Sequence, residues 1–321
     1  RQMCIRDRTA MEAVSVKREP NFLKVLKRKP RIGEGYILVQ NRLAIADSKA
    51  SLKNNLNLLK LFEEGLRTKL LIHPDAMRLV SANLNLIDQK MRNSDEAVRI
   101  FRDLLLKHGN PERALRRMNE LGVLAAFIPE FKPIVAMLQF NMYHSFTVDE
   151  HTIQTIGHLA AIERGELVEE LPVASAILGS GLNRKVIYIA LLLHDIGKGQ
   201  IEDHSVLGAK IARDVAPRLG LTARESKNVE WLVRHHLLMS DMAQKRDIAD
   251  PRTVRDFAKA VQSVKRLNLL TVLTVCDISG VGPGVWNNWK AVLIRALYRL
   301  SLIHISEPTR PERIGDGGLW L

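Results

Sequence analysis

The stretch Leu192-Leu193-His194-Asp195-Ile196-Gly197-Lys198-Gly199 decides how the rest of the chain is interpreted. An apolar run that begins at Val186 brings adjacent His and Asp side chains to its end, and a glycine-rich turn follows. An imidazole and a carboxylate held side by side offer a divalent metal one nitrogen and one oxygen ligand. Because His-Asp pairs are also common as simple hydrogen-bonded neighbours, the interpretation depends on the other ligands that the chain provides.

Candidate partners for this pair occur on both sides of it: His151 upstream, and His204, His236 and Asp277 downstream. Thr147 and Glu150 form a predicted capping box, which would place His151 one turn inside a helix. The order His, His-Asp, His, His, Asp resembles the HD superfamily of metal-dependent phosphohydrolases.

Two of these positions leave alternatives open. His204 follows Asp203 at the predicted start of a helix, where it either reaches a second metal or only caps the helix. His235 and His236 are adjacent and cannot face the same way. His236 shares the spacing i, i+3, i+4 and i+7 with the apolar residues Val229, Leu232 and Val233, so we expect it to point inward.

Asp277 shares one helix face with Leu270, Leu273 and Thr274. A buried ionised carboxylate must be paired with a cation or bound to a metal, because its bare burial is very costly. We interpret Asp277 as the last metal ligand, and a salt bridge to Arg or Lys is the alternative.

Helical periodicity predominates from residue 51 to 300, so we predict an all-α fold. The exception is Gly35 to Ala46, where two short β-branched runs flank a polar turn and predict one β-hairpin. Thr222 with Glu225 predicts a second capping box. We expect the last amphipathic helix, which follows Trp286-Asn287-Asn288-Trp289-Lys290, to end near Arg299.

Composition limits the classes of function. The chain has 321 residues, 46% of them hydrophobic, and a formal net charge of +13 spread along its length. Its longest apolar runs fall short of the roughly 20 residues of a membrane span, and we see no secretory leader. The two cysteines, Cys4 and Cys276, predict no disulfide framework and favour a cytoplasmic location. The basic charge permits an acidic or phosphorylated partner, but a solvated surface is the favoured explanation, and we do not expect a nucleic-acid partner.

The two ends look like translated sequencing adapters rather than protein. Gln2-Met3-Cys4-Ile5-Arg6-Asp7-Arg8 resembles a transposon end, and Leu300 to Ser306 resembles its reverse complement. We therefore interpret residues 1–8 and 301–321 as adapter-like, and we expect them to pack poorly.

The ligand types also predict which metal is bound. Imidazoles and carboxylates without thiolates suit Mg²⁺, Mn²⁺ or Fe²⁺ better than a structural zinc. Asp195 is the natural ligand to bridge two such ions, and Lys198 is placed to pair with a substrate phosphate as a point charge.

Longer motifs make the resemblance more specific. They are Asp149-Glu150-His151-Thr152, the His194 to Gly199 stretch, Asp203-His204-Ser205-x-x-Gly208-Ala209, His236-Leu237-Leu238-Met239-Ser240 and Trp286-x-x-Trp289-Lys290. Together they resemble the bacterial bifunctional uridylyltransferase/uridylyl-removing family over residues 33–300. The resemblance implies a helical connector at the end of a nucleotidyltransferase region over residues 9–130 and an HD phosphohydrolase domain over 131–300.

The resemblance also implies a function: hydrolysis of uridylyl-tyrosine on the PII nitrogen-regulatory protein, with UMP as the product. A Gly-Ser followed by an Asp-x-Asp pair, which a uridylyltransferase needs, does not occur in this sequence, and the ACT domains of the family are missing too. We therefore expect only the removing activity. The alternatives are an HD phosphohydrolase for free nucleotides or nucleic acid, and a non-catalytic regulatory module.

Overall fold

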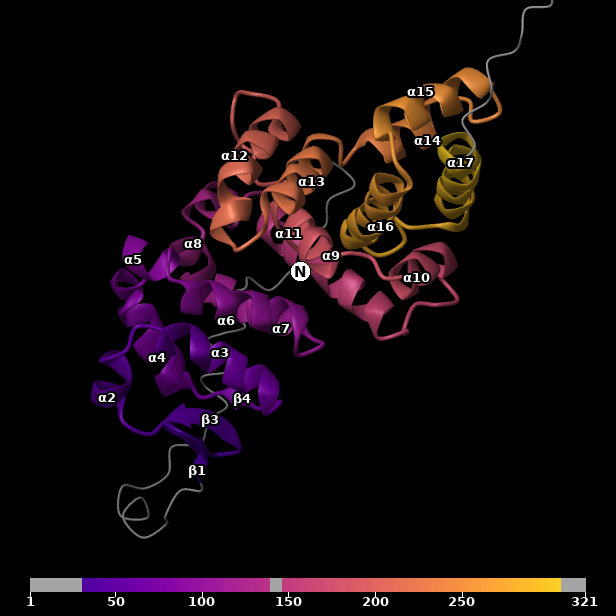
Figure 1. Ribbon diagram of the computed structural model, residues 1–321. Helices are drawn as coiled ribbons and strands as arrows, with labels where there is room; N and C mark the ends of the chain where they lie inside the picture. Colours follow the sequence, from indigo (N-terminus) through magenta and orange to yellow (C-terminus); the bar gives the residue numbers. More distant parts are fainter. Residues whose placement is uncertain (1–30, 139–145, 307–321) are drawn as a thin grey trace, which may run out of the picture.

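A computed structural model describes residues 31–138 and 146–306 and confirms a mostly helical fold with a small sheet near the start of the described chain (Figure 1). The sheet and the helices nearest to it lie at one end of the molecule, and the helices α14, α15 and α17 lie at the other (Figure 1). The helices that carry the candidate ligands lie between these ends.

The predicted hairpin is present, and it is part of a larger sheet. Strands β2 (Tyr36–Val39) and β3 (Arg42–Ile45) are antiparallel, and both residues of the turn, Gln40 and Asn41, have positive φ, at 49° and 59°. Such a turn matches the twist of the paired strands. Two short strands that we did not predict, β1 (Arg31–Gly33) and β4 (Leu71–Ile72), complete a sheet of order β1-β2-β3-β4, in which β4 is parallel to β3.

Short helices follow the hairpin and form the connector. They are α2 (Ser48–Leu52), α3 (Asn57–Arg67), α4 (Pro74–Ala82), the 3-10 helix η2 (Leu84–Leu86), α5 (Gln89–Arg92), α6 (Asp95–Leu106), α7 (Pro111–Glu120), α8 (Val123–Phe127) and the 3-10 helix η3 (Pro129–Ile134). Helix α7 begins with a proline at its first position, where a missing N–H costs nothing.

The second group of helices forms the bundle. They are α9 (Val148–Glu163), α10 (Pro172–Gly179), α11 (Arg184–Leu193), α12 (His204–Arg218), α13 (Ala223–Arg234), α14 (Leu238–Lys245), α15 (Pro251–Val261), α16 (Val264–Gly280) and α17 (Asn288–Ser306). Helix α11 is central: every residue from Val186 to Leu193 is buried, because it packs against α9, α13 and α16. An all-round apolar helix requires such a position.

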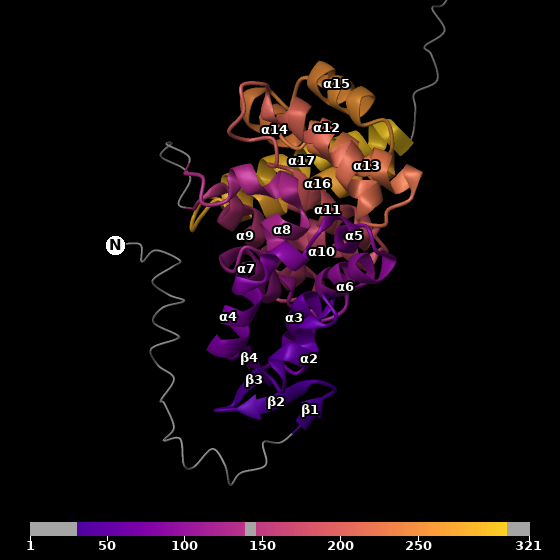
Figure 2. The ribbon, with the colours of Figure 1, turned by 90° about the vertical axis from the view of Figure 1, so that its left-hand side faces the viewer.

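The connector and the bundle share one hydrophobic core. A single buried cluster runs from Leu43 in β3 to Leu297 in α17. Helix α7 packs against α9, and α6 packs against α11, so the helices on either side of the junction lie next to one another (Figure 2). Within the described residues, no helix combines the length and the apolar character needed to cross a membrane.

Two local predictions are wrong. Thr147 is the N-cap of α9, but its side chain makes no capping hydrogen bond, and the Glu150 side chain pairs with Arg116. The last helix does not end near Arg299: α17 continues to Ser306, and Ser301 is fully buried. That residues 301–321 derive from an adapter stays a prediction. Residues 1–8 and 307–321 lie outside the described chain.

The capping box at Thr222 and Glu225 does form, and Glu225 also joins α13 to the start of α11. Its carboxylate accepts hydrogen bonds from Thr222 N at 3.0 Å and Asn183 Nδ2 at 3.0 Å, and lies 2.8 Å from Lys185 Nζ. Burial alone would raise the pKa of Glu225. The hydrogen bonds from Lys185, Asn183 and Thr222 outweigh it and lower this pKa from 4.5 to about 2. The carboxylate therefore stabilises the fold above pH 4.5, and this contribution is lost as the pH falls toward 2.

We predict that Glu225→Gln lowers the free energy of unfolding at pH 7 by roughly 1–3 kcal/mol, as expected for hydrogen bonds to a charged group. The difference from the parent protein should shrink below about pH 4.5, since the parent then loses the same charge. Urea unfolding between pH 7 and pH 3 measures both effects. Glu230→Gln, on the same helix, is the control, because the partner of Glu230 in the described part of the chain is the exposed Arg213. Equal losses in the two variants would contradict the prediction.

Candidate metal centre

Five places in the bundle bring the six predicted ligands together. His151 lies in the first turn of α9, and His194 and Asp195 directly follow the last residue of α11. His204 is the first residue of α12, where Asp203, not His204, caps the helix. His236 follows α13, and Asp277 lies on α16. The turns at the ends of α11 and α13 and the starts of α9 and α12 therefore all face one region.

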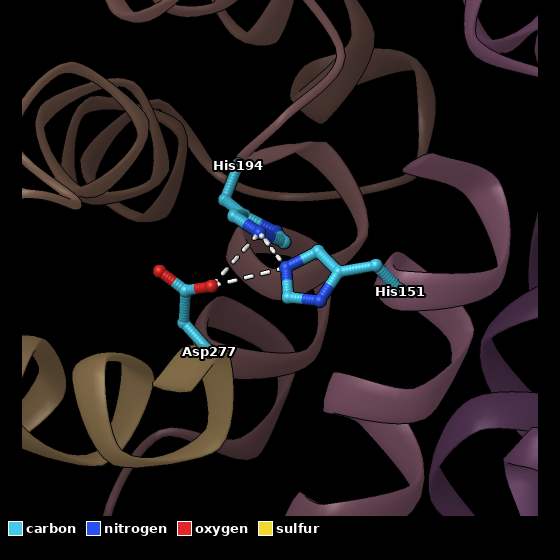
Figure 3. Close-up of side chains that lie close together, drawn as sticks. All are labelled: His151, His194 and Asp277. Atoms are coloured by element: carbon cyan, nitrogen blue, oxygen red, sulfur yellow. Dashed lines mark hydrogen bonds and ion pairs between the residues drawn. The ribbon is translucent and has the colours of Figure 1, made fainter. Parts of the chain in front are cut away.

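His151, His194 and Asp277 form the first cluster (Figure 3). The Nε2 atoms of His151 and His194 are 3.2 Å apart, and Asp277 Oδ1 is 3.0 Å from His151 Nε2 and 3.6 Å from His194 Nε2. Asp277 thus points at the two imidazoles. Among the described residues no Lys or Arg pairs with it, so the alternative of a salt bridge is not what the structure contains.

Asp195, His204 and His236 form the second cluster, with one ligand atom of each within 4.8 Å of the others. His236 Nε2 is 3.7 Å from Asp195 Oδ1, and the rings of His204 and His236 are 5.3 Å apart between centroids. The other carboxylate oxygen of Asp195 faces the first cluster, at 3.4 Å from His194 Nε2. Asp195 therefore lies between the two clusters.

The neighbouring His235 points elsewhere. Its ring stacks on Trp231, with centroids 4.8 Å apart, and its Nδ1 is 2.9 Å from the Trp231 carbonyl oxygen. His236, in contrast, is 1% exposed. The structure places His236 with the other candidate ligands and His235 on the outer side of α13.

Backbone carbonyls fix the orientation of two rings. His194 Nδ1 is 2.7 Å from Leu191 O, and His236 Nδ1 is 2.8 Å from Val233 O. Since a carbonyl only accepts, each Nδ1 carries the hydrogen, and each Nε2 is directed to the centre as the metal-binding atom. The Nε2 atoms of His204 and His236 are buried and have no hydrogen-bond partner among the residues that the structure describes.

The electrostatics explain how the two acids are tolerated. Burial would raise the pKa of Asp195 and of Asp277, but the neighbouring imidazoles, together with Lys198 at Asp195, outweigh it and hold both well below the usual range. Burial would likewise lower the pKa of His194, but Asp195 and Asp277 raise it to about 10. For His236 burial prevails and lowers the pKa to about 4. Two carboxylates are thus balanced by Lys198 and a protonated His194.

Lys198 lies in the turn after α11, with its Nζ 2.6 Å from Asp195 Oδ2. The sequence predicts that Lys198 pairs with a substrate phosphate; in the structure its partner is the carboxylate at the middle of the site. Lys198 thus supplies positive charge next to the two clusters.

Glycines permit the close approach of the elements. A Cβ at Gly197 would collide with the His204 carbonyl and would lie 2.7 Å from Gly208 N, so Gly197 brings α12 and His204 next to His194. A Cβ at Gly280 would lie 2.7 Å from Thr155 Cγ2 and 3.4 Å from His151 Nδ1. Sequence reasoning missed Gly280; its signal is a small residue one turn after a predicted buried carboxylate.

The donor set fits divalent ions. Ligands bound at about 2.0–2.2 Å to one ion lie roughly 3 Å from one another, and the first cluster has separations of 3.0–3.6 Å. Buried imidazole nitrogens without partners and carboxylates that need positive charge are what a bound cation would satisfy.

We predict that Gly197→Ala destabilises the protein by about 1–3 kcal/mol, because the added methyl group meets backbone atoms of α12 that cannot rotate away. Gly179→Ala is the matched control: nothing lies within 4 Å of its Cβ position at the end of α10. Thermal unfolding of both variants tests this. A loss no larger in Gly197→Ala than in Gly179→Ala would show that α12 does not approach the turn so closely.

Comparisons with known proteins agree with this geometry. The family model described as "HD domain" matches residues 148–276, and the model described as "Uridylyltransferase GlnD third domain" matches residues 36–127. The chain is 71% identical over 290 residues to the bifunctional uridylyltransferase/uridylyl-removing enzyme of Ruegeria pomeroyi, covering 90% of this chain and 32% of that protein.

Two further relatives carry the same name. The enzyme of Cereibacter sphaeroides is 69% identical over 289 residues, and that of Azospirillum brasilense is 46% identical over 314 residues. The matches cover 90% and 97% of this chain, but 31% and 32% of these relatives, so the chain spans about a third of their length. The chain belongs to the family of bifunctional uridylyltransferase/uridylyl-removing enzymes, of which it carries the third domain and the HD domain.

Proposed function

We propose that this chain contains the metal-dependent phosphodiesterase centre that removes UMP from the uridylylated PII protein. The observation that carries the proposal is the convergence of four imidazoles and two carboxylates on one buried site in two adjoining clusters. The "uridylyl-removing" part of the relatives' name supports the substrate class. PII as partner, UMP as product and a cytoplasmic location belong to the proposal.

His151, His194 and Asp277 would hold one divalent ion, and Asp195, His204 and His236 would hold the second, with Asp195 facing both. Mg²⁺ or Mn²⁺ suits these ligands, and Fe²⁺ is a further candidate. Such ions, when bound, lower the pKa of water and neutralise charge on a phosphoryl oxygen.

The chain's own residues would then act in distinct ways. Asp277 and Asp195 orient the imidazoles next to them and supply the two carboxylates of the site. Lys198 pairs with Asp195 in the structure, 2.6 Å away. Because bound ions would take over the neutralisation of Asp195, the ammonium group of Lys198 becomes available to a phosphate of the substrate. The burial of the site keeps bulk water from screening these charges.

We predict that Asp195→Ala and His236→Ala abolish UMP release from uridylylated PII in the presence of Mn²⁺, because each removes a ligand from the second cluster. Lys198→Ala should slow release less, since it removes a charge near the substrate and no ligand. His235→Ala is the matched control for His236→Ala and should retain activity, because His235 stacks on Trp231.

The same assay separates the competing functions. Faster hydrolysis of free nucleotides or RNA than of uridylylated PII would support an HD phosphohydrolase with another substrate. Parent protein that hydrolyses none of these substrates with Mg²⁺, Mn²⁺ or Fe²⁺ would support the non-catalytic regulatory module. Equal activity in His236→Ala and the parent would contradict the assignment of the site.

A further inference from the structure

Two acidic residues precede the candidate ligand His151 in α9, and both are buried without belonging to either metal cluster. Asp149 is 2% exposed and Glu150 is 7% exposed. They do not cap their own helix, since Thr147 and Glu150 form no capping box. A buried carboxylate needs a donor or a cation close to it, so the partners of these two acids show what they do.

The partners that the two acids have outside α9 come from α7, on the connector side of the junction. Within α9, Gln154 Nε2 also donates to Glu150 Oε1 at 3.2 Å. Arg116 pairs with Glu150, and Asn119 Nδ2 donates to Asp149 Oδ2 at 2.7 Å. Arg116 is itself oriented by Glu112, whose Oε1 lies 2.6 Å from its Nη2. Helix α7 belongs to the part matched by the third-domain model, whereas α9 opens the part matched by the HD model. The contacts therefore join two family regions at the turn that carries a candidate ligand.

Because of the geometry of a helix, these two contacts hold α9 from one side. Successive residues of an α-helix are about 100° apart around its axis, so α9 can present Asp149 and Glu150 to α7 while His151 faces α11 and α16 (Figures 2 and 3). The two contacts restrain the first turn on this side against rotation about its axis and against sliding along α7.

The helix approaches α7 and α16 closely. A Cβ at Gly157 would collide with the Glu112 carboxylate of α7, and one at Gly280 of α16 would lie 2.7 Å from Thr155 Cγ2. Helix α9 is thus fixed between the connector and the helix that carries Asp277. His151 Nε2 lies 3.0 Å from Asp277 Oδ1, and productive ligand sites tolerate errors of only about 0.5 Å.

We propose that Arg116 and Asn119 are positioning residues for the metal centre: by binding Glu150 and Asp149 they set the placement of His151, so the connector is part of the hydrolytic site. This inference rests on the proposed function, in which His151 is a metal ligand. Removal of either partner leaves α9 folded, because its apolar face remains buried, but loosens the turn that aims His151.

The test is the affinity of the full chain for Mn²⁺, measured by titration with detection of the free ion. Arg116→Met should raise the Kd for Mn²⁺ by about 10- to 100-fold, the range for residues that support a metal ligand. Arg116→Lys, which keeps a cation for Glu150, should recover most of the affinity. At saturating Mn²⁺ the kcat for UMP release by Arg116→Met should approach that of the parent, because the ligands themselves are intact.

Arg113→Met is the matched control on the same helix. Arg113 donates to the backbone carbonyls of Lys69 and Leu70, within the connector. The substitution Arg113→Met should lower the melting temperature and leave the Kd for Mn²⁺ unchanged. An equal rise of Kd in Arg113→Met and Arg116→Met would reduce the effect to general loosening and overturn the inference.

If Arg116→Met fails to fold, Asn119→Ala tests the inference instead. It removes one neutral hydrogen-bond donor to Asp149 and should weaken Mn²⁺ binding several-fold. Unchanged affinity in the folded variants overturns the positioning role while the proposed function stands. Parent protein that binds no Mn²⁺ would instead remove the proposed function, and the inference with it.

Discussion

The carboxylates of Asp195 and Asp277 lie where the helices of the bundle meet, and a carboxylate in such a place requires positive charge beside it. Much of the site can be understood as the supply of that charge. Lys198 and a protonated His194 provide this positive charge in the structure. Buried imidazole nitrogens of His204 and His236 lie next to Asp195. A binding site for divalent cations follows, because metal ions supply the same charge and use the same imidazoles as ligands.

Charge alone would not bring six side chains from distant parts of the sequence together; the packing of the helices does this. Helix α11 is buried on all sides, so the positions of His194 and Asp195 at its end are fixed by the core. Glycines permit close approaches around it: Gly197 lies against α12, and Gly280 of α16 lies against α9. The polar contacts between α7 and α9 attach the connector to these helices. The connector therefore lies next to the element that carries His151.

The sequence alone could reveal much of the fold and the candidate ligands. Apolar periodicity predicts the helices, and the order of His and Asp residues selects the side chains that the structure brings together. The choice of His236 over His235 followed from helical spacing. Strands β1 and β4 could not be predicted, because they have three and two residues and β4 pairs with a strand far away in sequence. The capping box predicted at Thr147 does not form, and this too involves a distant residue. The Glu150 side chain pairs with Arg116 on another helix, and the local sequence does not indicate this pairing.

If two divalent ions bind among these six side chains, diffraction from crystals grown with Mn²⁺ will locate them. We expect two anomalous peaks about 3.5–4 Å apart. One should lie among His151, His194 and Asp277, and the other among Asp195, His204 and His236. Well-ordered crystals with no peak at these residues, or with Mn²⁺ bound only elsewhere on the chain, would contradict this expectation.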